Sequence, residues 1–368
     1  MLKKITIKGY KSIKEAEIEL GNINILIGAN GAGKSNFISF FKLLRWMIQI
    51  PGQLQLFIGK SGGANSLLFE GAAVTPQIEA ELQFETDVGR NDYFFRLFHG
   101  SPDTFIFAEE KYRFSRNTYQ GLANWIPLDA GHKEAAIIDK STSGDATAKT
   151  LVRQIQNKCV VYQFHNTSDT ARIRQKWKVD ENSYLLEDAA NLAPFLLRLQ
   201  EHESAYYKRI VEVLTLIVPF FSNFVLEPEY GSIMLKWREK GSDLLFTANQ
   251  ASDGTLRAMA LITVLLQPPE ILPEVLILDE PELGLHPYAI NTICGLINLI
   301  SHRCQVILAT QSTLLVDGFE PKDILVVERK NRPSCFSRLD AEDLQDWLDE
   351  YSLSELWNKN LIGGRPSR

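Results

Sequence analysis

The segment 23–36, INILIGANGAGKSN, decides the fold of this chain. Residues 23–27 are almost all branched and apolar, which predicts a buried strand that runs directly into a glycine-rich loop. After the loop, apolar residues from Phe37 to Leu44 recur at the spacing of one helix face. Residues 28–35 match the pattern G-x-x-x-x-G-K-[ST] in full, and they lie between a strand and a helix as a phosphate-binding loop must.

The chemistry of this loop follows from its glycines and its last residues. Glycines allow backbone N–H groups to converge on a triphosphate, and the following helix adds a favourable dipole. Lys34 is expected to reach the β and γ phosphates, and the Ser35 hydroxyl to ligate Mg²⁺. The expected nucleotide contacts are Asn30, Gly31, Ala32, Gly33, Lys34, Ser35 and Asn36. The alternative is a chance glycine-rich turn. A second Gly-Lys-Ser, at 59–61, lacks the upstream glycine and is expected to belong to a loop over 52–66.

Residues 275–280, VLILDE, place two carboxylates directly after four apolar residues. A buried strand that delivers Asp279 to a magnesium ion has this pattern. Glu280, one residue on, is then the candidate general base for the attacking water. The alternative is a core strand that ends in two surface acids, but the phosphate-binding loop favours the catalytic interpretation.

A second candidate anion site opens the apolar helix predicted over 255–266. Residues 252–255, SDGT, bring free backbone amides and a hydroxyl to a helix N-terminus. Taken alone, Ser252 and Asp253 are more simply a helix cap.

Together these motifs resemble those of ABC-type ATPase heads of the SMC- and RecF-like kind. Residues 252–255 are similar to the signature loop of such heads, and 281–287, PELGLHP, resemble the segment after their catalytic glutamate. Residues 309–312, ATQS, match the switch loop, and 7–12, IKGYKS, are similar to the first strand. The chain therefore looks like a stand-alone AAA-class ATPase, similar to RecF and to the ATPase part of OLD-family proteins.

The resemblance implies a fold and a pair of cofactors. The fold is α/β, a P-loop NTPase of the ABC-type ATPase head kind with an antiparallel β subdomain and a helical lobe. The implied cofactors are ATP and Mg²⁺, with Ser35 and Asp279 at the metal and Glu280 as the base. Gln163, which follows a strand predicted at 159–162, is the candidate glutamine-loop residue that senses Mg²⁺.

The resemblance also implies an ATP-gated homodimer. Two heads would sandwich two nucleotides, with Ser252 and Gly254 of one chain contacting the γ-phosphate held by the other. One position departs from the family, because the switch normally carries a histidine and this chain has Gln311. An amide can hydrogen-bond the phosphate or water but cannot take up a proton at neutral pH, so we expect slow hydrolysis. His286 is the nearest alternative imidazole, although packing against the partner chain is an equal alternative for it.

The head is expected to have three parts followed by a tail. These are 1–162 with the P-loop and β subdomain, 163–255 with a helical lobe ending in the signature loop, 256–335 with the Walker B and switch strands, and the acidic helical tail 336–368. Three strands between 78 and 112 predict an antiparallel meander. A long polar excursion should follow to about residue 150, and a last strand is expected over 323–328.

Two charged segments have open interpretations. In the first, 171–178, positive residues recur at every second position: Arg172, Arg174, Lys176 and Lys178. This segment is either a strip that contacts a DNA backbone or a solvated face. In the second, 340–350, there are six acidic residues and no basic one, and Leu344, Trp347, Leu348 and Tyr351 share a helical face. That helix either docks a partner protein or folds onto its own domain.

Composition excludes several classes of protein. The net charge of −6 argues against a protein that coats nucleic acid with its whole surface. No apolar run approaches the roughly 18 residues of a membrane span, and the start lacks the pattern of a secretory signal. The four cysteines form no C-x-x-C pair, so we expect a reduced cytoplasmic protein without a membrane partner.

The leading functional hypothesis is an ATPase that cycles between open and ATP-closed dimers in DNA repair, DNA sensing or defence against phage. The alternative is a regulatory ATPase subunit that controls a separate effector protein, such as a nuclease or toxin. Too few residues follow Ser312 for the nuclease domain of OLD-type proteins, so we expect any destructive activity to come from another polypeptide.

Overall fold

The computed structural model describes residues 1–49, 52–118, 121–156 and 159–365. Within these residues, a core sheet has the strand order β17-β16-β3-β15-β14-β8. Its strands are β3 (Ile23–Ile27), β8 (Cys159–Tyr162), β14 (Val275–Asp279), β15 (Gln305–Ala309), β16 (Ile324–Arg329) and β17 (Ser334–Arg338). β17 pairs antiparallel to β16 and the other pairings are parallel. Every residue of β3, β14 and β15 is buried, which explains why four of the five residues in each strand are apolar.

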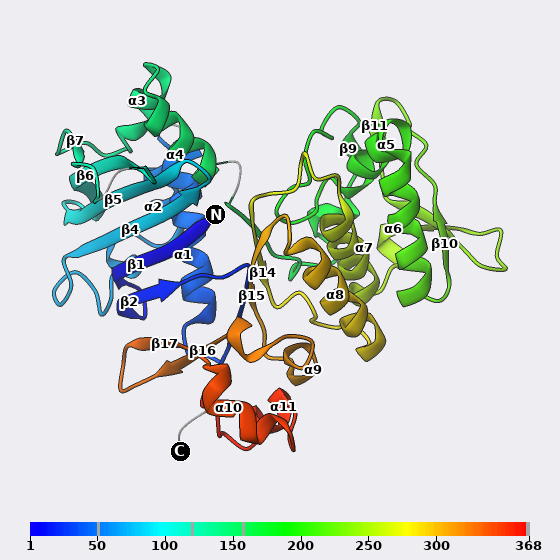
Figure 1. Cartoon of the computed structure of the whole chain (residues 1–368). Coiled ribbons are helices and arrows are strands. Elements are labelled where there is room, and N and C mark those ends of the chain that lie inside the picture. Colours follow the sequence, from blue (N-terminus) through cyan, green and yellow to red (C-terminus); the bar gives the residue numbers. More distant parts are fainter. Residues whose placement is uncertain (50–51, 119–120, 157–158, 366–368) are drawn as a thin grey trace.

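An antiparallel sheet lies beside the core sheet, with the order β2-β1-β4-β5-β6-β7. Its strands are β1 (Leu2–Tyr10), β2 (Ile13–Glu19), β4 (Gln77–Thr86), β5 (Gly89–Gly100), β6 (Thr104–Arg116) and β7 (Ile126–Leu128). The helix α1 (Lys34–Gln49) packs between the two sheets (Figure 1). Phe40 of α1 contacts Tyr10 of β1 edge-on, with ring centroids 5.3 Å apart, and it stacks over Phe95 of β5 at 6.4 Å. The predicted meander is therefore present and is anchored on the helix that follows the P-loop.

A helical lobe covers the other face of the core sheet (Figure 1). Its helices are α5 (Leu192–His202), α6 (Ser204–Ile217), α7 (Asp253–Leu266) and α8 (Pro287–Ile300). Short strands complete the lobe: β9 (Trp177–Lys178) with β11 (Ser232–Ile233), and β10 (Phe221–Phe224) with β12 (Lys236–Glu239) and β13 (Leu245–Thr247). Within the lobe, α7 begins at the predicted signature loop. The chain then returns to the core sheet at β14.

Two stretches expected as irregular contain helices. The segment 52–66 holds α2 (Gln53–Lys60), which buries Leu54 and Ile58 one turn apart. The segment up to residue 156 holds α3 (Ile137–Thr142) and α4 (Ala146–Gln156). α4 buries Leu151 and Ile155 on one face. This apolar stripe is short and is surrounded by polar residues in the sequence, so its helical spacing is hard to recognise there. The strand β16 is also not the last one, because β17 follows it.

The basic segment does not form an extended strip. Arg172–Arg174 is a 3₁₀ turn, and only Trp177–Lys178 is a strand. Arg174 is buried, whereas Arg172 pairs with Asp188 at 2.9 Å and Lys176 with Glu229 at 3.1 Å. Three of the four cations, Arg172, Arg174 and Lys176, therefore have separate acidic partners, and the segment presents no continuous positive face.

The tail helices pack on the head beside β16 and β17 (Figure 1). They are α10 (Ala341–Leu348) and α11 (Leu353–Asn358), and α11 lies against α9 (Thr313–Val316). Leu344 and Leu348 contact the core cluster, while Trp347 remains 47% exposed. Within the described residues, every helix is too short or too polar to span a bilayer.

Candidate nucleotide site

The P-loop is held in place by a residue of β17. It connects β3 to α1, and Phe37 N donates to Gly33 O at 3.0 Å in the first turn of the helix. Gly33 has φ 121°, and a Cβ there would lie 2.1 Å from Ser334 Oγ. The same hydroxyl donates to Ala32 O at 2.6 Å, and its oxygen lies within hydrogen-bond distance of Ser12 Oγ, at 2.8 Å. Ser334 of β17 therefore fixes the loop from behind, and a larger residue at position 33 would displace it.

Lys34 lies inside the loop that it terminates. Its Nζ donates to Gly28 O at 2.5 Å and to Ala29 O at 3.3 Å. Burial lowers the pKa of Lys34, while the nearby carboxylates of Glu280, Asp279 and Glu282 act in the opposite direction. A partly desolvated ammonium group beside a glycine-rich loop at a helix N-terminus is a strong site for a polyphosphate.

A cavity of about 310 Å³ joins the P-loop to the ends of two core strands. It is lined by Ala29, Asn30, Gly31, Gly33, Lys34, Ser35, Asn36, Glu280 and Gln311. Most of the predicted P-loop contacts, the candidate base and the switch residue thus meet in one space. Ala32 is the predicted P-loop contact that does not line this cavity: it is buried, and its carbonyl oxygen accepts the Ser334 hydroxyl.

Gln163 and Asp279 meet because they follow neighbouring parallel strands. Tyr162 of β8 pairs with Leu278 of β14, so the next residues lie at the same sheet edge. Gln163 Nε2 donates to Asp279 Oδ2 at 2.7 Å, and Lys42 Nζ donates to Gln163 Oε1. An ammonium only donates and a carboxylate only accepts, so the two partners fix the orientation of the amide. Burial lowers the pKa of Lys42, opposed by Glu187 and Asp279.

Asp279 fits a divalent cation. Its Oδ1 is buried and has no hydrogen-bond partner among the described residues. Burial raises the pKa of this carboxyl, and His165 and the hydrogen bond from Gln163 oppose that shift. The described residues hold no cluster of three acidic, histidine or cysteine side chains that could bind a metal by themselves. Mg²⁺ is commonly held by one or two carboxylates together with substrate phosphates, and Asp279 with Ser35 suits that arrangement.

Glu280 and Gln311 face each other across the ends of β14 and β15. Gln311 Nε2 donates to Glu280 Oε1, and Glu280 N donates to Ala309 O at 2.8 Å. Glu280 has φ +44°, a conformation that is rare for a residue with a side chain. The turn after β14 therefore holds the candidate base in a fixed, strained position beside the P-loop.

Glu282 accepts hydrogen bonds from the candidate switch loop. One oxygen accepts the Thr310 hydroxyl and the Gln311 N–H, the latter at 3.4 Å. The other oxygen, Oε2, is buried without a partner in the described structure. Burial raises the pKa of Glu282, and the hydrogen bond from Thr310 opposes this shift. Sequence reasoning missed this residue, although a third acid in the PEL segment was a signal.

The predicted signature residues lie outside this cavity. Ser252 is exposed and caps α7, since its Oγ accepts the Thr255 N–H at 3.2 Å, and Gly254 lies in the first turn. Arg257 ties this helix to the segment after β14 by donating to Leu283 O at 3.0 Å. Arg174 braces the loop from inside, with a 3.2 Å ion pair to Asp253. The capping interpretation is therefore correct, and it leaves the hydroxyl facing outward.

His286 does not approach the cavity. It is exposed and caps α8, where its Nδ1 accepts the Tyr288 N–H at 3.2 Å. Within the chain it therefore does not replace the histidine missing from the switch position.

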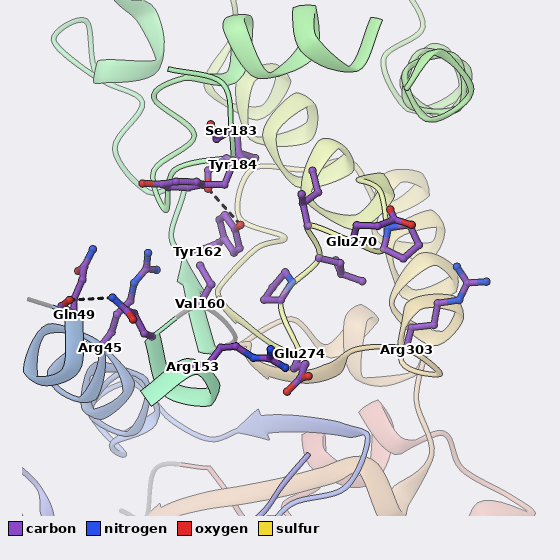
Figure 2. Close-up of a pocket in the computed structure, with 16 residues that line it drawn as sticks. Arg45, Gln49, Arg153, Val160, Tyr162, Ser183, Tyr184, Glu270, Glu274 and Arg303 are labelled. Carbon is purple, nitrogen blue, oxygen red and sulfur yellow. Dashed lines mark hydrogen bonds between the residues drawn. The ribbon is translucent and has the colours of Figure 1, made fainter. Parts of the chain in front are cut away.

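A larger cavity of about 800 Å³ lies at the free edge of β8 (Figure 2). Arg45 and Arg303 lie on opposite sides of it, and Tyr184 lies above it. Arg45 pairs with Glu187 at 2.6 Å, and Glu187 O accepts the Gln163 N–H at 3.0 Å. Two contacts of Glu187 thus link this cavity to Gln163, which donates a hydrogen bond to Asp279.

The fold and the cavity define a P-loop ATPase head, and comparison with known proteins gives the family. Residues 23–317 match the family described as "AAA domain, putative AbiEii toxin, Type IV TA system", and the chain belongs to it. None of the curated proteins matches the sequence.

Two solved structures share the fold. The SmcHead bound to the C-winged helix domain of ScpA is 18% identical, with a TM-score of 0.61, covering 94% of this chain and 99% of that one. The Smc head domain of Pyrococcus furiosus, with an extended coiled coil and bound to the C-terminal domain of ScpA, is 14% identical, with a TM-score of 0.56 and coverage of 95% and 98%. The predicted ABC-type, SMC-like ATPase head and its α/β class are therefore confirmed.

Proposed function

We propose that this chain binds ATP with Mg²⁺ and hydrolyses it slowly. The shared cavity carries this proposal, because it joins the P-loop to Glu280 and Gln311. Lys34 and the loop amides would hold the phosphates, and Ser35 with Asp279 would hold the metal. When bound, Mg²⁺ would neutralise phosphate charge. Glu280 would accept the proton of the attacking water, and Gln311 would orient the Glu280 carboxylate through its amide N–H.

We further propose that two copies close around the nucleotides. Ser252 and Gly254 open a helix whose N-terminus is exposed and lies outside the chain's own nucleotide cavity. A helix N-terminus of this kind would complete the phosphate site of a second copy. Residues 1–335 would act as the head in this dimer, with 336–368 as its tail.

The first candidate role is an ATP-gated dimer that senses or remodels DNA, in repair or in antiviral defence. The family description, which names a toxin–antitoxin system, and the SMC-head fold support it. The dispersed basic segment supplies no DNA strip, so the contact would have to be made elsewhere on the dimer.

The second candidate role is a cytoplasmic regulatory subunit that controls a separate effector such as a nuclease or toxin. The cavity at the β8 edge favours it, since a partner that engages Arg45 would compete with Glu187. That competition would act on the backbone contact to Gln163 and thereby on the metal carboxylate.

The experiment that separates these roles is steady-state ATP hydrolysis with and without linear double-stranded DNA. The Glu280→Gln variant serves as the blank. A several-fold stimulation that falls with salt supports the DNA role, because phosphate contacts release counterions. A slow rate that is indifferent to DNA supports the effector role. No hydrolysis above the blank would refute the ATPase assignment itself.

A further inference from the structure

The C-terminal segment of the chain returns to the P-loop. Leu356, Trp357 and Ile362 are buried in the core cluster and anchor the segment after α11. Gly364 then lies next to Gly28, the first residue of the P-loop: a Cβ on Gly364 would be 3.4 Å from Gly28 Cα. The segment after α11 therefore lies beside the first residue of the P-loop, although the two are far apart in the sequence.

The contact depends on two consecutive glycines. Gly363 and Gly364 both have φ +78°, in the left-handed region that glycine favours. Gly364 N donates to Glu328 Oε1 at 2.8 Å, and a Cβ on Gly363 would come within 2.7 Å of the same oxygen. On the other side, a Cβ on Gly364 would be 3.2 Å from Trp357 Nε1. Glu328 of β16 and Trp357 thus confine the glycine pair to one position.

Gly28 is confined from both sides as a result. A Cβ on Gly28 would lie 2.2 Å from Val327 O, so the residue rests directly on β16. The tail covers it from the other direction. Gly28 O is the acceptor for Lys34 Nζ, and any shift of Gly28 therefore moves the partner of the phosphate-binding lysine.

A small cavity separates the tail from the outer side of the loop. It measures about 220 Å³ and is lined by P-loop residues 29–32, by β16 and by Gly364 and Arg365. Ala29, Asn30 and Gly31 line both this cavity and the nucleotide cavity. The P-loop therefore separates the nucleotide cavity from the cavity next to the tail.

We propose that residues 363–365 are a functional part of the nucleotide site. The hydrogen bond between Glu328 and Gly364 holds the tail against Gly28 and keeps the P-loop in its binding conformation. Glu328 and Gly364 are positioning residues, since they act through the loop. This inference rests on the proposed ATP binding. Coupling between two sites is reciprocal, so bound nucleotide must stabilise the tail as much as the tail favours nucleotide.

The first test is the affinity of the full-length protein for a fluorescent ATP analogue with Mg²⁺. Glu328→Ala and Gly364→Val should weaken binding about tenfold, and the unfolding midpoint of Glu328→Ala without nucleotide should stay close to that of wild type. Glu328→Gln keeps an acceptor oxygen and should bind like wild type. A chain that ends at Arg365 is the control for the truncation Δ361–368, which should bind weakly. Wild-type affinity in Glu328→Ala would overturn the inference, even if Gly364→Val fails to fold.

The second test uses reciprocity. Hydrogen exchange in a peptide that covers 359–365 should slow when MgATP is added to wild type, and should not change in Lys34→Ala. Unchanged exchange in a wild-type protein that binds MgATP overturns the tail inference alone. A wild-type protein that binds no nucleotide overturns the proposed function, and the tail inference with it.

Discussion

Gln311 donates its side-chain amide to Glu280 Oε1 across the ends of β14 and β15. The hydrogen bond holds the candidate base in one orientation beside the P-loop. It also occupies one lone pair of the carboxylate, and the donor cannot relay a proton. The same contact therefore explains both how the base is placed and why we expect turnover to be slow.

Replacing Gln311 by histidine should raise the steady-state rate of ATP hydrolysis about tenfold. An imidazole can hydrogen-bond Glu280 and can also take up and release a proton near neutral pH. The measurement is phosphate release at saturating MgATP. A rate equal to or below that of wild type would show that the amide is not what limits turnover.

Lys34→Ala should weaken nucleotide binding by about 100-fold or more, because the loop loses its charge-assisted phosphate contact. The matched control is Lys60→Ala, in the second Gly-Lys-Ser. Lys60 ends α2 and lies over the ring of Trp46 at 4.9 Å, away from the cavity. Isothermal titration with MgATP should show binding only by the control. Tight binding by Lys34→Ala would remove the phosphate-loop assignment.

Ser252→Arg should leave ATP binding by the monomer intact and prevent ATP-dependent dimers. Ser252 is exposed and lies outside the chain's own cavity, so a large cation there obstructs only a second copy. Loss of the helix cap should cost about 1 kcal/mol, which thermal unfolding will register. Tyr230→Arg adds the same charge at a fully exposed position of the same lobe and should still dimerise. Dimers of Ser252→Arg seen by light scattering would refute the trans arrangement.

Glu282→Gln should change how stability depends on pH. Burial raises the pKa of Glu282 above its ordinary 4.5. In the pH interval between the ordinary and the raised pKa, the folded state therefore binds more protons than the unfolded state. Stability contributed by this group is therefore lost as pH rises through the interval. Relative to wild type, the variant should therefore gain unfolding free energy when the pH is raised from about 4.5 to about 7.5.

Urea unfolding without nucleotide at both pH values measures that change. Glu212→Gln, at an exposed position of α6, is the control and should show no such difference. A difference for Glu282→Gln that is flat with pH, or of opposite sign, would contradict the burial of an ionised carboxyl beneath the switch loop.

The residues that could be predicted lie in short continuous motifs. The P-loop, Asp279, Glu280 and Gln311 each follow a buried strand of β-branched and leucine residues, and parallel strands deliver such residues to one sheet edge. The alignment of Gln163 with Asp279 follows from the same rule, because β8 and β14 are neighbours.

The supporting residues could not be predicted because the fold brings them together from distant segments. Ser334 lies 302 positions after Ala32, to whose carbonyl oxygen it donates, and no sequence feature near Ala32 predicts this contact. Gly364 contacts Gly28 only because α11 is anchored beside β16. The conformation of the basic segment 171–178, for which two interpretations were open, could not be predicted for the same reason: Arg174 is buried and its guanidinium donates to Thr167 O and to the distant Ala248 O.

The mass in solution of Glu280→Gln with MgATP, measured by light scattering, decides whether two copies of the chain close around ATP. An amide at position 280 should preserve nucleotide binding while removing the base, so ATP should accumulate in the closed state. We expect a monomer without nucleotide and a stable dimer with MgATP, and adding Ser252→Arg to the same chain should leave only monomers. A Glu280→Gln variant that stays monomeric while it binds MgATP would refute the ATP-closed dimer, and one that hydrolyses ATP at the wild-type rate would exclude Glu280 as the base.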